Sequence, residues 1–221
     1  SITIFGGLVV QGLSNSPAVI WSNHTPVWQG GLTGLWEGVT VEVGGSLVAQ
    51  HLVLRNARAA FHINGTADLT SVTVEDSYMG IRAQGVVTAT DFSCERIDFT
   101  CIEVKQTGSA TVNGASSVDS AISVESHGYL DLDSLTVSDG SIGLILNDGS
   151  TGSADGLSIM STSTAIISRG MTSVGVDSLT VDDVSLLFDG VSSDGAHLSN
   201  VSGEVDLVAI GSDLLDVTLS D

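Results

Sequence analysis

A glycine recurs about every twenty residues along most of this chain, and a similar pattern of apolar residues follows it. The intervals between these glycines are 20, 20, 23, 20, 21, 21, 20 and 21 residues. The series consists of Gly45, Gly65, Gly85, Gly108, Gly128, Gly149, Gly170, Gly190 and Gly211. A repeat of this length is typical of solenoid proteins, in which each repeat stacks on its neighbours.

Within each repeat, apolar side chains occupy alternate positions, as they do in strands with one buried face. The positions seven and nine residues after the glycine hold, in three consecutive repeats, Leu52/Leu54, Val72/Val74 and Phe92/Cys94. Three such segments fill a repeat of about twenty residues and leave corners too short for a helix. The pattern therefore predicts an all-β solenoid of about nine or ten rungs, where a rung is one turn of the coil.

These features resemble the right-handed parallel β-helix of the pectate-lyase-like superfamily. The stretch GLWEGVTVEVGGSLVAQHLVLRNA is typical of a rung in such proteins, and the resemblance covers about residues 36–219. It implies one β-helix domain over residues 1–221, with a first rung at 1–20, an inserted loop at 21–35 and regular rungs at 36–221, each of three short strands. A fold of this kind carries no function by itself.

The chain is strongly acidic, with 26 Asp and Glu against six Lys and Arg and a formal net charge of −20. Such a surface repels nucleic acid and anionic membranes, so neither is predicted as a partner. The sequence has no run of about 18 uncharged apolar residues, so no membrane-inserted segment is predicted. The first residues lack the positive charge of a signal peptide, so any such peptide would already have been removed. We expect an extracellular or cell-surface protein.

Short polar residues recur at one corner of the repeat, eleven residues after the glycine. They are Asn56, Asp76, Asp119 and Asp139; the polar residues nearby in other rungs are Asp98, Ser161, Asp182 and Asn200. Side chains of this kind bond to nearby backbone amides and tolerate unusual backbone angles. The prediction is a structural ladder without cofactor or metal; binding of calcium by the carboxylates is the weaker alternative.

The few basic residues gather near the end of the repeat. Three positions before the glycine stand His62, Arg82, Lys105 and Glu125, and one position before it stand Asn64, Gln84 and His127. Because neighbouring strands lie about 4.8 Å apart, these residues would form a strip of mixed charge. Such a strip could hold an anionic sugar, or it could balance charge along an acidic solenoid, which is the preferred interpretation.

Two further features have open or weak interpretations. Asp131 and Asp133 are two residues apart on one predicted strand, as a pair of hydrolytic carboxylates could be, but solvated surface acids explain them better. Cys94 occupies a core position and Cys101 lies near the following corner, so a buried thiol and a disulfide are equally compatible with the sequence.

The function predicted from the sequence is non-enzymatic: a secreted or cell-surface rod, adhesin or fibre subunit. The alternative is a module that binds or cleaves polysaccharide through the strip around Arg82 and Lys105. Because "SITIF" and "LLDVTLSD" are both predicted to be strands at uncapped ends, the partner expected for a rod is a second copy stacked head to tail. The alternative function implies a polysaccharide partner.

Overall fold

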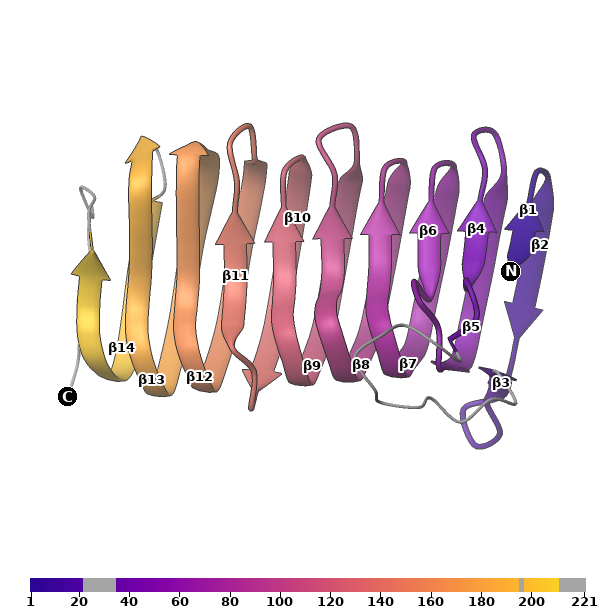
Figure 1. Ribbon diagram of the computed structural model, residues 1–221, viewed down its shortest axis with the longest axis horizontal. Helices are drawn as coiled ribbons and strands as arrows, with labels where there is room; N and C mark the ends of the chain where they lie inside the picture. Colours follow the sequence, from indigo (N-terminus) through magenta and orange to yellow (C-terminus); the bar gives the residue numbers. More distant parts are fainter. Residues whose placement is uncertain (22–34, 195–196, 211–221) are drawn as a thin grey trace.

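The computed structural model describes residues 1–21, 35–194 and 197–210, and this part of the chain is a parallel β-solenoid without a helix. In Figure 1 the near strands point upward and the chain returns behind them while it advances from right to left, so the coil is right-handed. The predicted fold class is confirmed. Most of the loop predicted at 21–35 lies outside the described residues. Within the described residues, no helix is long and apolar enough to cross a membrane.

Several strands are long and bent because consecutive segments of a rung run into one another, whereas others are as short as predicted. The first six are β1 (Ile2–Ile4), β2 (Gly7–Gln11), β3 (Ala18–Trp21), β4 (Val39–Val41), β5 (Ser46–Arg55) and β6 (Phe61–Ile63). The next five are β7 (Thr66–Ala83), β8 (Val86–Val104), β9 (Ser109–Ser126), β10 (Tyr129–Ser138) and β11 (Ile142–Leu146). The last three are β12 (Thr151–Met171), β13 (Ser173–Asp194) and β14 (His197–Ile210).

Each rung pairs in parallel with the rungs before and after it, in continuous register. One column of directly paired residues runs through Ile2, Val39, Phe61, Ile81, Ile102, Val124, Leu144, Ile166, Phe188 and Ala209. These ten stacked positions agree with the predicted nine or ten rungs.

The inward side chains of the rungs form one apolar core along the solenoid axis. Leu54, Leu69 and Val74 are fully buried, as the alternating pattern predicts. Because buried aliphatic side chains stack in the same columns from rung to rung, the hydrophobic effect stabilises every rung through its neighbours.

Close backbone contacts between rungs require glycine at the first five closing positions, from Gly45 to Gly128. A Cβ atom on Gly65 would lie 2.3 Å from the carbonyl oxygen of Gly45, and one on Gly85 would lie 2.1 Å from that of Gly65. Real side chains do not approach this closely. Over this part of the chain, the glycine repeat therefore reflects a backbone packing constraint at one corner of the coil.

At the other corners, the strands bend at two columns of residues whose backbone has the left-handed conformation, with positive φ. The predicted ladder residues Asn56, Asp76, Asp119 and Asp139 have φ between 49° and 58°. In the intervening rung Arg96 takes this position, with φ of 55°, rather than Asp98. The second column, which was not predicted, includes His51, Ser71, Asp91, Gly114 and Ser134. Asn and Asp tolerate this conformation better than most residues do, which suits the structural role predicted for the ladder.

A disulfide bond joins Cys94 and Cys101 within β8, so the alternative of a free thiol is wrong. Both cysteines are buried, and the Cα atoms are 5.9 Å apart. The bond spans the place where the register of β8 shifts, since Ser77 pairs with Ile97 but Met79 pairs with Thr100. The disulfide therefore encloses one extra residue of the longest repeat.

Candidate functional site

The polar residues singled out in the sequence lie on two different parts of the solenoid. The lateral strip follows the ends of β6, β7, β8, β9 and β11. It contains His62, Arg82, Glu103, Glu125, Asn64, Gln84, Lys105, His127 and Asn147. The corner groove lies beside the first of the two columns of left-handed residues, the one that contains the predicted ladder. It is lined by Asp76, Arg96, Ile97, Asp98, Asp119, Ser120, Ala121, Asp139, Gly140 and Ser141.

Lys105 does not take its predicted place beside Arg82. The residue paired with Arg82 is Glu103, which in turn pairs with Glu125. The glycine spacing misplaces Lys105 because the corner at 105–108 has four residues, whereas the corresponding corner at 84–85 has two. Lys105 instead follows the strand end in the position occupied by Gln84 and His127 in the adjacent rungs.

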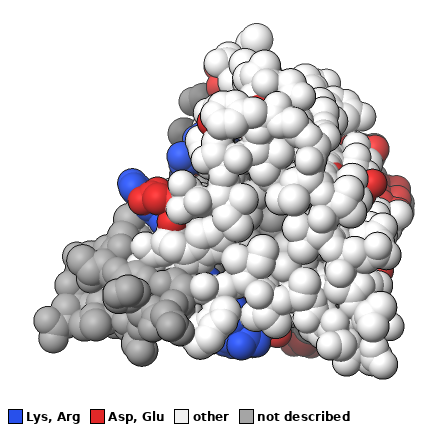
Figure 2. Space-filling model, turned by 90° about the vertical axis from the view of Figure 1, so that its right-hand side faces the viewer, with Lys and Arg blue, Asp and Glu red and all other residues white. Residues whose placement is uncertain are grey.

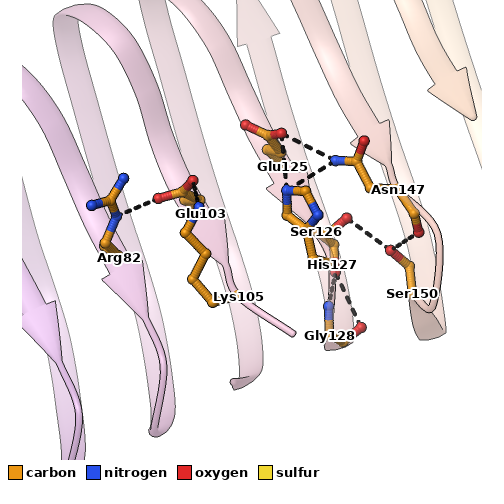
Figure 3. Close-up of polar contacts among 9 residues, drawn as sticks. All are labelled: Arg82, Glu103, Lys105, Glu125, Ser126, His127, Gly128, Asn147 and Ser150. Atoms are coloured by element: carbon orange, nitrogen blue, oxygen red, sulfur yellow. Dashed lines mark hydrogen bonds and ion pairs between the residues drawn. The ribbon is translucent and has the colours of Figure 1, made fainter. Parts of the chain in front are cut away.

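The carboxylate of Glu103 joins the two basic residues of the lateral strip. Nε of Arg82 donates to one carboxylate oxygen at 2.6 Å, and Nζ of Lys105 donates to the other. The side chain of Glu103 is only 3% exposed. Figure 3 shows both cations turned toward this carboxylate. The positive charges that were candidates for binding an anionic ligand are therefore paired within the protein.

The pairing with Lys105 and Arg82 lowers the pKa of Glu103. Burial alone would raise the pKa, but the hydrogen bonds from Lys105 and Arg82 more than offset burial and hold it below its ordinary value of 4.5. A carboxyl group with a lowered pKa in the folded state stabilises the protein above its unfolded pKa, and this contribution is lost as the pH falls through the folded pKa.

We therefore expect acid to weaken the wild-type protein partly through Glu103. The free energy of unfolding should fall as the pH drops below about 4.5, and Glu103→Gln should flatten this part of the dependence. Urea unfolding followed by circular dichroism at several pH values measures it. Glu37→Gln, at a carboxylate that is 64% exposed, is the control and should keep the wild-type slope. Equal slopes for wild type and Glu103→Gln would contradict the assignment.

A second polar cluster lies one rung further along the lateral strip. The Nδ2 group of Asn147 donates to Oε1 of Glu125 at 3.0 Å, and Nε2 of His127 lies 3.1 Å from the same oxygen. Figure 3 shows these three side chains converging. Beside them is a shallow hollow of about 240 Å³, lined by Lys105, Gln106, His127 and Asp148. Asn147 was not among the predicted site residues, although it follows a strand end by one residue, as His127 does.

The remaining predicted strip residues make fewer contacts. Nδ2 of Asn64 lies 3.4 Å from the carboxylate of Glu42, at the limit of a hydrogen bond. Nε2 of His62 has no hydrogen-bond partner among the described residues, although this atom is buried. Gln84 is exposed. The strip is thus two separate clusters around Glu103 and Glu125 rather than one row of converging groups.

The corner groove is the larger hollow, with a volume of about 520 Å³. Its walls combine aspartates from four successive rungs with Arg96. Nε of Arg96 donates to Oδ1 of Asp76 at 2.5 Å, and the same guanidinium also contacts Glu75 and Glu95. Among the described residues, Asp76 is thus bonded to a side chain and not, as predicted for the ladder, to a neighbouring amide.

Asp98 lines this groove with its side chain exposed. Desolvation by the surrounding protein, and then the negative charge of Asp119, raise the pKa of Asp98 above its ordinary value. Directly beside Asp98 in the sequence, the ring of Phe99 stacks on that of Tyr78, with centroids 5.5 Å apart. A raised pKa is the direction of shift that a carboxyl group acting as a general acid requires.

No group of three or more metal-ligating side chains occurs within residues 1–21, 35–194 and 197–210. Asp131 and Asp133 lie on β10 away from both hollows, and Asp131 accepts a hydrogen bond of 2.7 Å from Ser153. Their position fits surface acids better than a hydrolytic pair.

The sequence matches no protein-family model and no curated protein. Among solved structures, it is similar to the catalytic unit of a thermostable GH87 alpha-1,3-glucanase from Streptomyces thermodiastaticus strain HF3-3, with 13% identity and a TM-score of 0.49. The match covers 99% of this chain and 62% of that chain. At this identity and TM-score the likeness carries no information about activity or substrate.

Proposed function

We propose that this protein is a non-enzymatic, extracellular or cell-surface β-solenoid whose lateral side chains stabilise the stack of rungs. The observation that carries the proposal is the pairing of Arg82 and Lys105 with the buried carboxylate of Glu103. A site for an acidic sugar needs cations that are free to meet the ligand, whereas these cations, one from the preceding rung and one from the rung of Glu103, offset the cost of burying its charge.

The disulfide and the charge of the chain support the extracellular part of the proposal. Disulfides persist mainly in oxidising compartments outside the cytosol. A net charge of −20 keeps a protein soluble and discourages non-specific association. Both properties suit a spacer or an adhesin displayed at a surface.

A second candidate function, the binding or hydrolysis of an oligosaccharide, is favoured by the corner groove and not by the lateral strip. The groove offers hydrogen-bonding groups along four rungs, and the pKa of Asp98 is raised, which is the direction that a proton donor requires. In such a reaction Asp98 would protonate the glycosidic oxygen, and a second carboxylate such as Asp119 would activate water.

One titration series separates the two functions. Wild type, Arg82→Ala/Lys105→Ala and Asp98→Asn are titrated calorimetrically with neutral and acidic oligosaccharides, and released products are measured by chromatography. The structural function predicts no saturable heat and no product for any of the three proteins. It also predicts a lower thermal midpoint for the double variant than for wild type, because Glu103 is left buried without its cations.

Two outcomes would contradict the structural function. Saturable binding that disappears in Asp98→Asn and persists in the double variant would establish the corner groove as the site. Binding that disappears in the double variant, with its fold intact by circular dichroism, would restore the lateral strip as a site for acidic sugars.

A further inference from the structure

Two serines lie directly over the disulfide bond, in the next rung of the solenoid. Ser117 is the direct partner of Cys94 in the pairing of β8 with β9. Ser123 lies over Cys101, because the residues before and after this cysteine pair with the residues before and after this serine. The serines therefore occupy in β9 the places that the two cysteines occupy in β8.

Both serine hydroxyls are buried in the core without a hydrogen bond. Ser117 is 1% exposed and Ser123 is 0% exposed. Neither Oγ atom has a hydrogen-bond partner among the described residues. A hydroxyl that leaves water without gaining a new partner destabilises the folded state, and native proteins rarely contain one. Two such groups in equivalent places to a bonded pair indicate that they share a partner.

The serine pair leaves room for a small group inside the core. The Cβ atoms of a disulfide-bonded pair lie about 3.8 Å apart, and stacking in register gives the two serines a similar spacing. Two hydroxyl oxygens occupy less volume than two sulfur atoms, and Gly143, which follows Ser123 in the same column, has no side chain. The apolar side chain of Ile159 closes the space beside this glycine, since its Cδ1 would lie 2.6 Å from a Cβ atom there.

The surroundings of the serine pair are uncharged. Its direct neighbours in the two columns are the disulfide on one side and Val137 and Gly143 on the other. In the view along the solenoid axis, charged side chains lie toward the margins of the molecule (Figure 2). An ion between the serines would have no opposite charge to offset its desolvation. Water is neutral and can both donate to a hydroxyl and accept from one.

We propose that the serine pair binds one internal water molecule, which bridges Oγ of Ser117 and Oγ of Ser123. A hydrogen bond between water and a hydroxyl spans about 2.8 Å, so one water reaches both side chains. The two hydroxyls meet the lower limit of the roughly two to four polar partners that a buried water needs. The bridge is the counterpart in β9 of the covalent bond in β8. The proposed structural function does not require this water, so either proposal can fail without the other.

The test locates the water and measures its contribution to stability. A high-resolution crystal structure of the 221-residue chain gives its position, and water-selective NOE spectroscopy shows whether it is long-lived in solution. Urea unfolding compares wild type with Ser117→Ala, Ser123→Ala and the variant that carries both substitutions. Ser116→Ala, at the partly exposed neighbour of Ser117 on the same strand, is the matched control.

We expect wild type and Ser116→Ala to hold a water within about 2.8 Å of both hydroxyls. Ser117→Ala and Ser123→Ala should each lose the water, leave the other hydroxyl without a partner and lower the urea midpoint. The double variant should have a midpoint no lower than that of either single variant, because the second substitution removes the hydroxyl that the first one orphaned.

Three results would overturn the proposal. A single variant more stable than wild type would show that its hydroxyl had no partner to lose. Additive losses of stability in the double variant would show that the two hydroxyls act independently. A wild-type structure in which the hydroxyls of Ser117 and Ser123 bond directly to each other, with no water between them, would exclude the bridge whatever the variants do.

Discussion

Replacing Leu135 with alanine should lower the free energy of unfolding by about 2–5 kcal/mol. The side chain is 1% exposed and stacks between Ala115 and Leu157 of the adjacent rungs. Its removal leaves a cavity that the small Ala115 cannot fill, and the parallel backbone pairing on both sides limits collapse. The same argument applies to Leu54, which is fully buried in β5. Urea unfolding monitored by circular dichroism measures the change.

Asp133→Ala is the matched control on the same strand, two residues before Leu135. Asp133 is exposed and pairs directly with Asp155, so its removal also relieves a repulsion between like charges. We expect a change within about 0.5 kcal/mol, and the same for Asp131→Ala. An aspartate variant as damaging as Leu135→Ala would show that these acids hold a ligand or a structural ion.

The second large effect is expected at the disulfide. Cys94→Ala/Cys101→Ala should lower the free energy of unfolding by about 2–3 kcal/mol, the amount that the loop-entropy relation gives for a loop of roughly eight residues. The loss should also displace Arg96 and Asp98, which lie inside this loop and line the corner groove. Denaturant unfolding with and without dithiothreitol measures the first effect.

The reductant provides an internal control for that experiment. Because both cysteines are buried in the folded state, dithiothreitol should act once the chain unfolds, and it should move the wild-type midpoint to that of the double variant. The double variant itself should be unaffected. A wild-type midpoint that stays constant while mass spectrometry detects free thiols would contradict a stabilising role for the disulfide.

The repeat and the inward-facing residues could be predicted from the sequence because both follow from the alternation of side chains along a strand. Leu52 and Leu54 are buried for the same reason as Val72 and Val74, with no dependence on the length of any corner. The left-handed conformation of Asp76 was also predictable in kind, since short polar residues are the usual non-glycine residues at such angles.

The lateral contacts could not be predicted, because they depend on where the extra residues of a long repeat are placed. Two extra residues in the corner after Val104 bring Glu103, rather than Lys105, beside Arg82. The glycine interval of 23 residues shows that this repeat has three extra residues, but it does not show that one lies between the cysteines and two at the corner. Arg96 was missed for a different reason: it lies eleven residues after Gly85, as the ladder pattern requires, but it is not one of the short polar residues found at this corner in the other rungs. Spacing alone could not separate the disulfide from a free thiol.

The register of the rungs has a mechanical consequence. The hydrogen bonds between rungs lie along the long axis of the solenoid, so a pull on its two ends is expected to separate the rungs one after another rather than all together. Each rung that detaches releases roughly 70 Å of extended chain, from about 21 residues at about 3.4 Å each. The Cys94–Cys101 bond withholds only the short segment between the cysteines from this extension. Anchored at both ends, the protein would lengthen under tension in near-equal steps, as a shock-absorbing tether does.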